Sequence, residues 1–337
     1  MPDIESDWIA KLYSSALQTR KMADTAGWST IESDEGVFTS LVENLGVKGV
    51  QFEELISLDP DTIRSLGTVY GVIFLFKYLR QTPDINTSSS ADGTPTDPST
   101  LPPSFFFANQ TIQNACGTQA ILSVLLNHDT PSPENNNDPI TLGPELSSFK
   151  DFTTGFPSDL RGEALSNSEA IRTAHNAFAR ASPFVDETVR PRDEDEEGDV
   201  YHFIAYTPVN GTLYELDGLQ ASPISHGPCD ASIFPEKVIE VLQKRIARYP
   251  ETETRFNLMA VVKDLRIRAA EMGDQEALNT EERKRAGWAW ENSLRRSNFV
   301  GFIGEVLKGV TKVKEEEGSV EEWVKRAEAE TARRLRR

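Results

Sequence analysis

The Asn-Gly pair at positions 210 and 211 constrains the fold of this chain more than any other local feature. Asn-Gly supplies the positive φ angles of a two-residue type I′ turn, and alternating apolar segments, 201–206 and 213–217, flank it. We therefore expect an antiparallel hairpin. A two-residue loop fixes its register, so that Ile204 faces Asp217 across the hairpin.

This register brings a histidine close to a carboxylate. His202 and Ile204 share one face of the predicted hairpin, so His202 and Asp217 become diagonal neighbours on that face. Such neighbours lie roughly 7–8 Å apart at the backbone, a distance that an Asp side chain can span to hold a His ring. The turn therefore predicts a His–carboxylate pair.

Cys116 stands where a polar loop becomes an apolar segment, 119–126, in which we expect a helix. The free N–H groups and positive dipole at a helix N-terminus stabilise a thiolate. Gln110 lies shortly upstream, and its side-chain amide can donate to an oxyanion together with the backbone N–H of Cys116. A thiolate, an imidazole and a carboxylate are the components of a thiol hydrolase.

Each of these residues also has a purely structural interpretation. A cysteine on an apolar helix is often a small buried hydrophobe, and a strand histidine is often a hydrogen-bonded core residue. Asp217 precedes Gly218, where a strand can simply end. The residue pattern alone leaves both interpretations open.

The rest of the chain predicts an α+β body followed by a helical C-terminal module. We expect strands at 69–76 and 256–262, helices near 168–181 and 238–248, and helical pieces within 30–66. Segments 82–103 and 182–199 are polar and are expected to form loops, the first of them mobile. Residues 1–27 predict an appended amphipathic helix, with Met22 as an alternative start.

Length, charge and cysteine content exclude several classes of protein. The length of 337 residues suggests about two domains, and the longest apolar run, 69–76, is too short to cross a membrane. The formal charge is −18, made up of +5 on residues 283–337 and −23 on residues 1–282. This argues against nucleic-acid binding by the body and favours a basic partner.

The two cysteines, Cys116 and Cys229, cannot form a disulfide framework, and the acidic N-terminus does not resemble a signal peptide. We therefore expect a reducing compartment, cytoplasmic and nuclear. Cys229 has no motif around it. We expect His128 at the surface, His175 on a helix face and His226 in a turn, none of them spaced for metal binding.

The segment 110–118, Gln-Thr-Ile-Gln-Asn-Ala-Cys-Gly-Thr, closely resembles the active-site segment of the ubiquitin C-terminal hydrolases (peptidase family C12). The segments 202–203 and 213–218 match the His and Asp motifs of that family in the same order. The similarity extends over 28–262, including 32–38. The segment 288–308 resembles the helical tail of the large, proteasome-associated branch.

The resemblance implies a papain-like cysteine hydrolase fold, with helices around a central antiparallel sheet. It implies an N-terminal extension (1–27), a catalytic domain (28–265) with a crossover loop at 182–199, and a helical extension (266–337). Within the catalytic domain the resemblance makes Cys116 the nucleophile, His202 the general base and later acid, Asp217 its orienter and Gln110 the oxyanion donor. No metal or cofactor is implied.

The partners implied by the resemblance are ubiquitin and its conjugates, whose bond after the C-terminal glycine would be hydrolysed. The helical extension would bind a proteasomal ubiquitin receptor. A related branch uses a similar tail in a chromatin complex, so the arginine-rich end, 333–337, leaves nucleic-acid contact open there. An idle ubiquitin-binding scaffold and an unrelated papain-like peptidase are the remaining alternatives.

Overall fold

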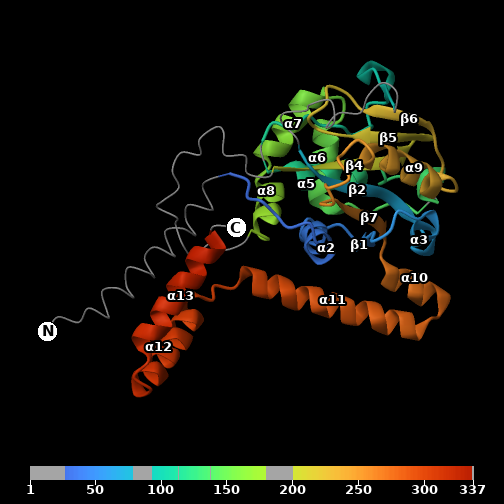
Figure 1. Cartoon of the computed structure of the whole chain (residues 1–337). Coiled ribbons are helices and arrows are strands. Elements are labelled where there is room, and N and C mark those ends of the chain that lie inside the picture. Colours follow the sequence, from blue (N-terminus) through green and yellow to red (C-terminus); the bar gives the residue numbers. More distant parts are fainter. Residues whose placement is uncertain (1–26, 79–92, 113, 137, 180–199, 336–337) are drawn as a thin grey trace. The chain divides into compact units, whose positions relative to one another are not determined.

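The computed structural model describes residues 27–78, 93–112, 114–136, 138–179 and 200–335. An antiparallel sheet organises this part of the chain, with the strand order β1-β7-β2-β4-β5-β6-β3 (Figure 1). Its strands are β1 (Val50–Glu54), β2 (Val69–Lys77), β3 (Thr94–Pro95), β4 (Tyr201–Val209), β5 (Thr212–Leu216), β6 (Ile224–Pro228) and β7 (Asn257–Lys263). The fold is thus the expected α+β arrangement.

Helices cover both faces of the sheet. The helices of the described residues are α2 (Glu35–Asn44), α3 (Pro60–Ser65), α5 (Cys116–Leu125), α6 (Gly143–Thr153), α7 (Ser158–Asn167), α8 (Glu169–Asn176), α9 (Phe234–Ile246), α10 (Leu265–Met272) and α11 (Gln275–Arg296) in the body, and α12 (Val300–Glu316) and α13 (Val320–Leu335) in a separate unit. Short 3₁₀ turns lie at Pro98–Thr100 and Pro133–Asn135.

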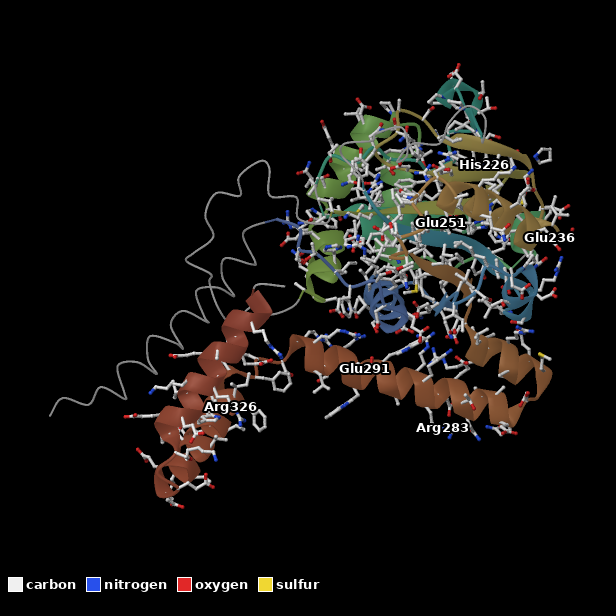
Figure 2. The ribbon with its side chains drawn as sticks, viewed as in Figure 1. His226, Glu236, Glu251, Arg283, Glu291 and Arg326 are labelled. Atoms are coloured by element: carbon white, nitrogen blue, oxygen red, sulfur yellow. The ribbon has the colours of Figure 1, made fainter. Side chains whose placement is uncertain are left out.

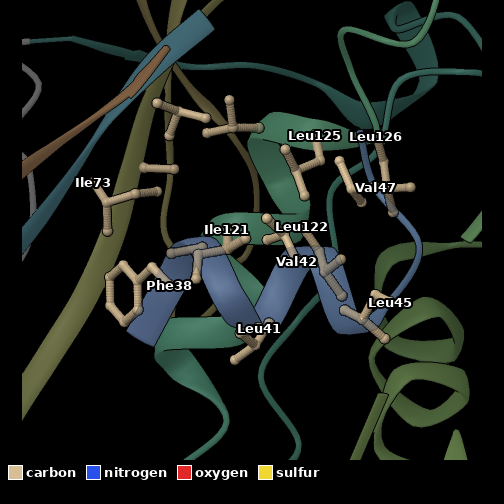
Figure 3. Close-up of a cluster of buried hydrophobic side chains, with 14 of the residues drawn as sticks. Phe38, Leu41, Val42, Leu45, Val47, Ile73, Ile121, Leu122, Leu125 and Leu126 are labelled. Atoms are coloured by element: carbon tan, nitrogen blue, oxygen red, sulfur yellow. The ribbon is translucent and has the colours of Figure 1, made fainter. Parts of the chain in front are cut away.

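The pleat of the sheet divides the core in two. On β2, Ile73 belongs to one buried cluster and its neighbours Val72 and Phe74 belong to the other, because successive strand residues point to opposite faces. The first cluster joins α2 to α5, where side chains of the two helices interdigitate (Figure 3). The second lies under α9. Helix α5, which carries Cys116, is therefore packed inside the body.

The Asn-Gly hairpin forms as expected. Asn210 and Gly211 have φ angles of 51° and 75°. Ala205 pairs with Leu216 and Val209 with Thr212, which is the register that places Ile204 opposite Asp217. The turn is also supported from outside, because the backbone N–H of Gly211 donates to the buried Glu134 carboxylate. The predicted register is confirmed.

Some expectations for individual elements were incomplete, and the one for His226 was wrong. The region 30–66 contains β1 between its two helices, and Thr94–Pro95, within the expected loop 82–103, pairs with β6 at the edge of the sheet. His226 lies in β6 and not in a turn. Backbone pairing decides these short segments, and it leaves little trace in their side-chain pattern. Residues 1–26, 82–92 and 182–199 lie outside the described residues.

Helix α11 belongs to the body. The described residues of 27–296 form one compact unit, and 297–335, with α12 and α13, belong to a second. Trp288 of α11 packs on Gly36, where a Cβ would come within 2.6 Å of the indole. The buried amide of Asn292 donates to the carbonyl of Gly36 at 3.0 Å. None of the described helices is both long and apolar enough to span a bilayer.

Candidate active site

Cys116 is the first residue of α5, and its surroundings leave the end of that helix open. Asn114 adopts a left-handed φ of 72°, which turns the chain sharply into the helix. Ala115 occupies the N-cap and provides no side-chain cap. The N–H groups of the first turn therefore stay available to an anion beside the sulfur. Cys116 itself is only half-buried.

His202 and Asp217 form the predicted pair. The Nε2 atom of His202 lies 2.6 Å from Oδ1 of Asp217, and both side chains are buried. Asp217 also accepts the backbone N–H of Leu219 at 2.9 Å, which fixes the carboxylate. The rings of Phe76 and Tyr78 meet the imidazole edge-to-face at 5.7 and 6.1 Å. The imidazole is thus held on several sides.

The second ring nitrogen of His202 is available to the sulfur of Cys116. The thiol of Cys116 interacts with the imidazole from the other side, and since Nε2 contacts the carboxylate, Nδ1 is left for the sulfur. Burial acts to lower the pKa of His202, but the bonds to Asp217 and Cys116 outweigh it and raise the pKa to about 9. Burial likewise opposes ionisation of Asp217, yet His202 holds the pKa of this carboxyl below its usual value.

Gln110 reaches the same site through Gly218, the residue after Asp217. The backbone N–H of Gln110 donates to the carbonyl of Gly218 at 2.8 Å, and its side-chain amide donates to the carbonyl of Ile112 at 3.1 Å. An amide has two N–H groups, so one remains for an oxyanion. A Cβ at Gly218 would overlap the side-chain amide of Gln119, which itself donates to the carbonyl of Ala108.

The sequence interpretation missed the supporting roles of Gly218 and Gln119. The only local signal was the Asp-Gly dipeptide, which marks the end of a strand but does not reveal what packs against it. Only the tertiary structure shows that the Asp217 and Gln110 segments are locked together by this close approach.

The four predicted residues meet around one cleft of about 690 Å³. Gln110, Cys116 and His202 line it directly, and Asp217 lies behind His202. The cleft is completed by residues from five segments of the body: Thr30, Ile31, Ser33, Leu75, Tyr78, Asn114, Gly117, Val200, Tyr201, Phe203 and Leu219. The geometry therefore brings together every residue singled out for the site.

The remaining histidines and the second cysteine serve structure. His128 was expected at the surface but is buried, where its ring bonds the hydroxyl of Thr207 at 2.8 Å. Burial lowers the pKa of His128 to about 4. His226 contacts Glu215 at 3.2 Å inside the sheet. Burial raises the pKa of Cys229 to about 12, which keeps that thiol unreactive. Among the described residues, no cluster of His, Cys, Asp or Glu could hold a metal ion.

His175 lies on a helix face, as expected, and that face is buried. Its ring bonds Thr118 of α5 at 2.7 Å and the carbonyl of Ser29 at 2.6 Å. Burial lowers the pKa of His175, so the neutral ring joins the helix that carries Cys116 to the segment that begins the described chain.

A cysteine at the start of a buried helix, facing a His–Asp pair on an antiparallel sheet, defines the thiol hydrolases of the papain-like class. Comparison with known proteins identifies the family within that class. Residues 28–247 match the sequence model of "Ubiquitin carboxyl-terminal hydrolase, family 1", and 274–315 match a second model described as "Ubiquitin carboxyl-terminal hydrolases". The chain belongs to the ubiquitin carboxyl-terminal hydrolase family and is a thiol-dependent hydrolase of that type.

Individual relatives resemble nearly the whole chain. Ubiquitin carboxyl-terminal hydrolase 2 of Schizosaccharomyces pombe is 49% identical over 85% of this chain and 91% of its own length. Ubiquitin carboxyl-terminal hydrolase isozyme L5 of Dictyostelium discoideum is 36% identical over 86% and 93%. The crystal structure of Trichinella spiralis UCH37 bound to ubiquitin vinyl methyl ester has a TM-score of 0.58 and 33% identity, covering 80% of this chain and 99% of that one.

Proposed function

We propose that this protein removes ubiquitin from its conjugates by hydrolysing the bond after ubiquitin's C-terminal glycine, with Cys116 as nucleophile. The observation that carries the proposal is the cleft in which the thiol of Cys116 meets the imidazole of His202, held in turn by Asp217. The solved relative that binds ubiquitin vinyl methyl ester supports ubiquitin as the substrate.

The reaction proceeds in two steps, formation of a thioester on Cys116 and its hydrolysis. The sulfur of Cys116 attacks the glycine carbonyl, and the resulting oxyanion receives the free amide N–H of Gln110 and the backbone N–H of Cys116. The His202 imidazolium gives its proton to the leaving amine, which departs and leaves a thioester. His202 then takes a proton from water, the hydroxide attacks the thioester, and ubiquitin leaves with a free carboxylate while the thiol is restored.

A ubiquitin with a C-terminal electrophile tests the nucleophile. We expect the wild type and a Cys229→Ala control to gain the mass of one ubiquitin, and Cys116→Ala to remain unlabelled. Cys229 is the matched control because it is the other thiol in the chain. Labelling of Cys116→Ala, or no labelling of the wild type, would contradict the assignment. Binding of ubiquitin without turnover would instead favour an idle scaffold.

We further propose that the C-terminal unit binds a proteasomal ubiquitin receptor and that the protein acts at proteasomes in the cytoplasm and nucleus. Helix α12 supports this proposal, because it exposes a run of apolar side chains on its own unit: Phe302, Ile303, Val306 and Leu307 are 69%, 50%, 47% and 49% exposed. Contiguous exposed apolar side chains commonly mark a protein-binding surface.

Titration with a purified receptor subunit tests this partner. Phe302→Glu should weaken binding at least tenfold and leave hydrolysis of ubiquitin esters unchanged. Ile56→Glu, a change at a side chain 91% exposed on the body, is the control and should bind normally. Equal binding by both variants would count against α12. Binding to nucleosomes in place of the receptor, abolished by removing 333–337, would favour the chromatin alternative.

A further inference from the structure

The segment 30–34, here called the cleft wall, contributes Thr30, Ile31 and Ser33 to the active-site cleft and belongs neither to the sheet nor to a helix. Ile31 and Ser33 face the cleft that holds Cys116, and Ile31 also packs against the core cluster. An irregular segment has no ladder of backbone hydrogen bonds to fix it. Its position therefore depends on the side chains that contact it.

Several elements contribute such contacts. At the N-terminal side, Ser29 donates to Asn176 of α8, and Asn114 donates to the carbonyl of Trp28 at 3.1 Å. Within the wall, the hydroxyl of Ser33 donates to Asn257 at 2.7 Å. These contacts join the segment to α8, to the residues just before α5 and to β7.

The opposite side of the cleft wall is held by α11. The guanidinium of Arg295 bonds Glu32 through Nε at 3.0 Å and Asp34 through a terminal nitrogen at 2.8 Å. Its other terminal nitrogen donates to Asn292 at 2.9 Å, which orients the group. Asp34 also caps α2 through the backbone N–H of Val37. One side chain of α11 thus joins the middle of the wall to the start of α2.

We propose that Arg295 is a positioning residue that holds the cleft wall where the C-terminal strand of ubiquitin must pass to reach Cys116. This inference rests on the proposed function. Arg295 does not touch the reacting atoms. It acts through Glu32 and Asp34, whose neighbours Ile31 and Ser33 line the cleft.

The size of the interaction predicts which measurement will change. The side chains of Arg295, Glu32 and Asp34 are 19%, 30% and 25% exposed, and partly exposed ion pairs add little to stability. Small displacements at a binding cleft nevertheless weaken substrate binding severalfold. A contact used equally before and during the reaction alters KM and leaves kcat unchanged.

The test compares Arg295→Gln with Arg283→Gln in the full-length protein, using an ester of ubiquitin as substrate. Arg283 lies on the side of α11 turned away from the sheet and bonds Asn279 and Thr280 of its own helix (Figure 2). Both changes remove one positive charge from the same helix. We expect KM to rise about three- to tenfold for Arg295→Gln only, with kcat within twofold of wild type.

Two further measurements separate positioning from loss of structure. The rate at which iodoacetamide alkylates Cys116 should match in all variants, because this small reagent does not need the wall. Arg295→Glu should raise KM further, and adding Glu32→Arg should bring KM back toward wild type by restoring an opposite-charge pair.

The possible failures are distinguishable. If the wild type turns over ubiquitin esters and Arg295→Gln has the KM of Arg283→Gln, the positioning role is wrong and the proposed function stands. If Arg295→Gln loses kcat in proportion to its folded fraction, measured by circular dichroism, its role is structural and the inference is also wrong. A wild type without turnover would overturn the proposed function and this inference together.

Discussion

At the scale of single residues, the chemistry depends on whether His202 carries its proton. Burial alone would favour the neutral ring, but the ring sits between a carboxylate and a thiol, and its pKa rises to about 9. The imidazolium is thus the ordinary form at neutral pH. It can protonate a leaving amine directly.

This pKa predicts the alkaline limit of activity. The kcat/KM for a ubiquitin ester should fall as pH rises through about 9, because the free enzyme then loses the His202 proton. In Asp217→Asn, the carboxylate that stabilises the His202 imidazolium is gone, while burial still lowers the pKa of His202. The alkaline limit of kcat/KM should therefore move to lower pH, and kcat should fall on the order of a hundredfold or more.

Asp230→Asn provides the control, since Asp230 bonds Ser232 at the surface and should leave the profile unchanged. An identical alkaline limit in wild type and Asp217→Asn would contradict the assignment.

The His202–Asp217 pair also predicts the pH dependence of stability. The raised pKa of His202 contributes stability that is complete below its ordinary value and is lost as pH rises through about 9, whereas the lowered pKa of Asp217 contributes stability that is lost in acid.

Gly218 gives a second prediction at this scale. A Cβ here would overlap the Gln119 amide and approach the Cβ of Gln110 at 3.1 Å, so Gly218→Ala must displace the segments that carry Asp217 and Gln110. We expect kcat for ubiquitin esters to fall about tenfold or more. Gly287→Ala is the control, because its Cβ would meet nothing within 4 Å on α11. Unchanged kcat in Gly218→Ala would show that the site tolerates this shift.

The sequence was informative about the reacting residues for a physical reason. A two-residue turn fixes which residues pair across a hairpin, and successive side chains of a strand alternate between its two faces. His202 and Asp217 could therefore be paired from their spacing alone. The contact of that pair with Cys116 joins segments far apart in the chain, and no local pattern carries it. Resemblance to a known family indicated that contact. Only the folded structure shows how Gln119 packs on Gly218.

At the scale of elements, α11 is attached to the body mainly through one face. Trp288 is buried to 7% exposure on that face, and its indole N–H donates to Glu35 at 3.1 Å. Lys284 and Arg285 place their charges over the same ring, at 5.3 and 5.2 Å from its centre. Trp288 and Asn292 are the buried residues of this helix, so this indole is its main buried apolar group.

Trp288→Ala should therefore destabilise the body by about 3–5 kcal/mol, the usual cost of removing a buried tryptophan. The free energy of unfolding in urea measures the loss. Trp290→Ala is a matched control on the same helix, because Trp290 is 65% exposed and should cost less than about 0.5 kcal/mol. Equal losses in the two variants would mean that α11 is not held by this face.

The elements that the sequence predicted are those with strong periodicity or turn chemistry. Strands β2 and β7 and helix α9 were expected within a few residues of their bounds. Strand β1 was missed because it is only five residues long, Val-Gln-Phe-Glu-Glu, and pairs with β7, more than 200 residues away. Long-range pairing of this kind overrides local propensity.

At the scale of the whole molecule, the negative charge is concentrated in the first 282 residues, whereas the C-terminal 55 residues carry a small positive excess. Residues 1–282 carry −23 and residues 283–337 carry +5. Part of this positive charge lies on α11 within the body, where Lys284 contacts Glu53 at 2.6 Å and Arg285 contacts Glu43 at 2.8 Å. A surface with a large excess of one sign attracts an oppositely charged partner over several ångströms before contact.

The acidic body should therefore accelerate the encounter with the basic C-terminal stretch of ubiquitin. We expect the association rate constant of ubiquitin with Cys116→Ala, measured by stopped flow, to fall about tenfold as salt rises from about 0.05 to 0.5 M. The dissociation rate should change much less, since short-range contacts control it. Alkylation of wild-type Cys116 by neutral iodoacetamide is the control and should not depend on salt, because that reagent is not steered. An association rate independent of salt would mean that the charge on the body keeps the protein soluble and does not guide its substrate.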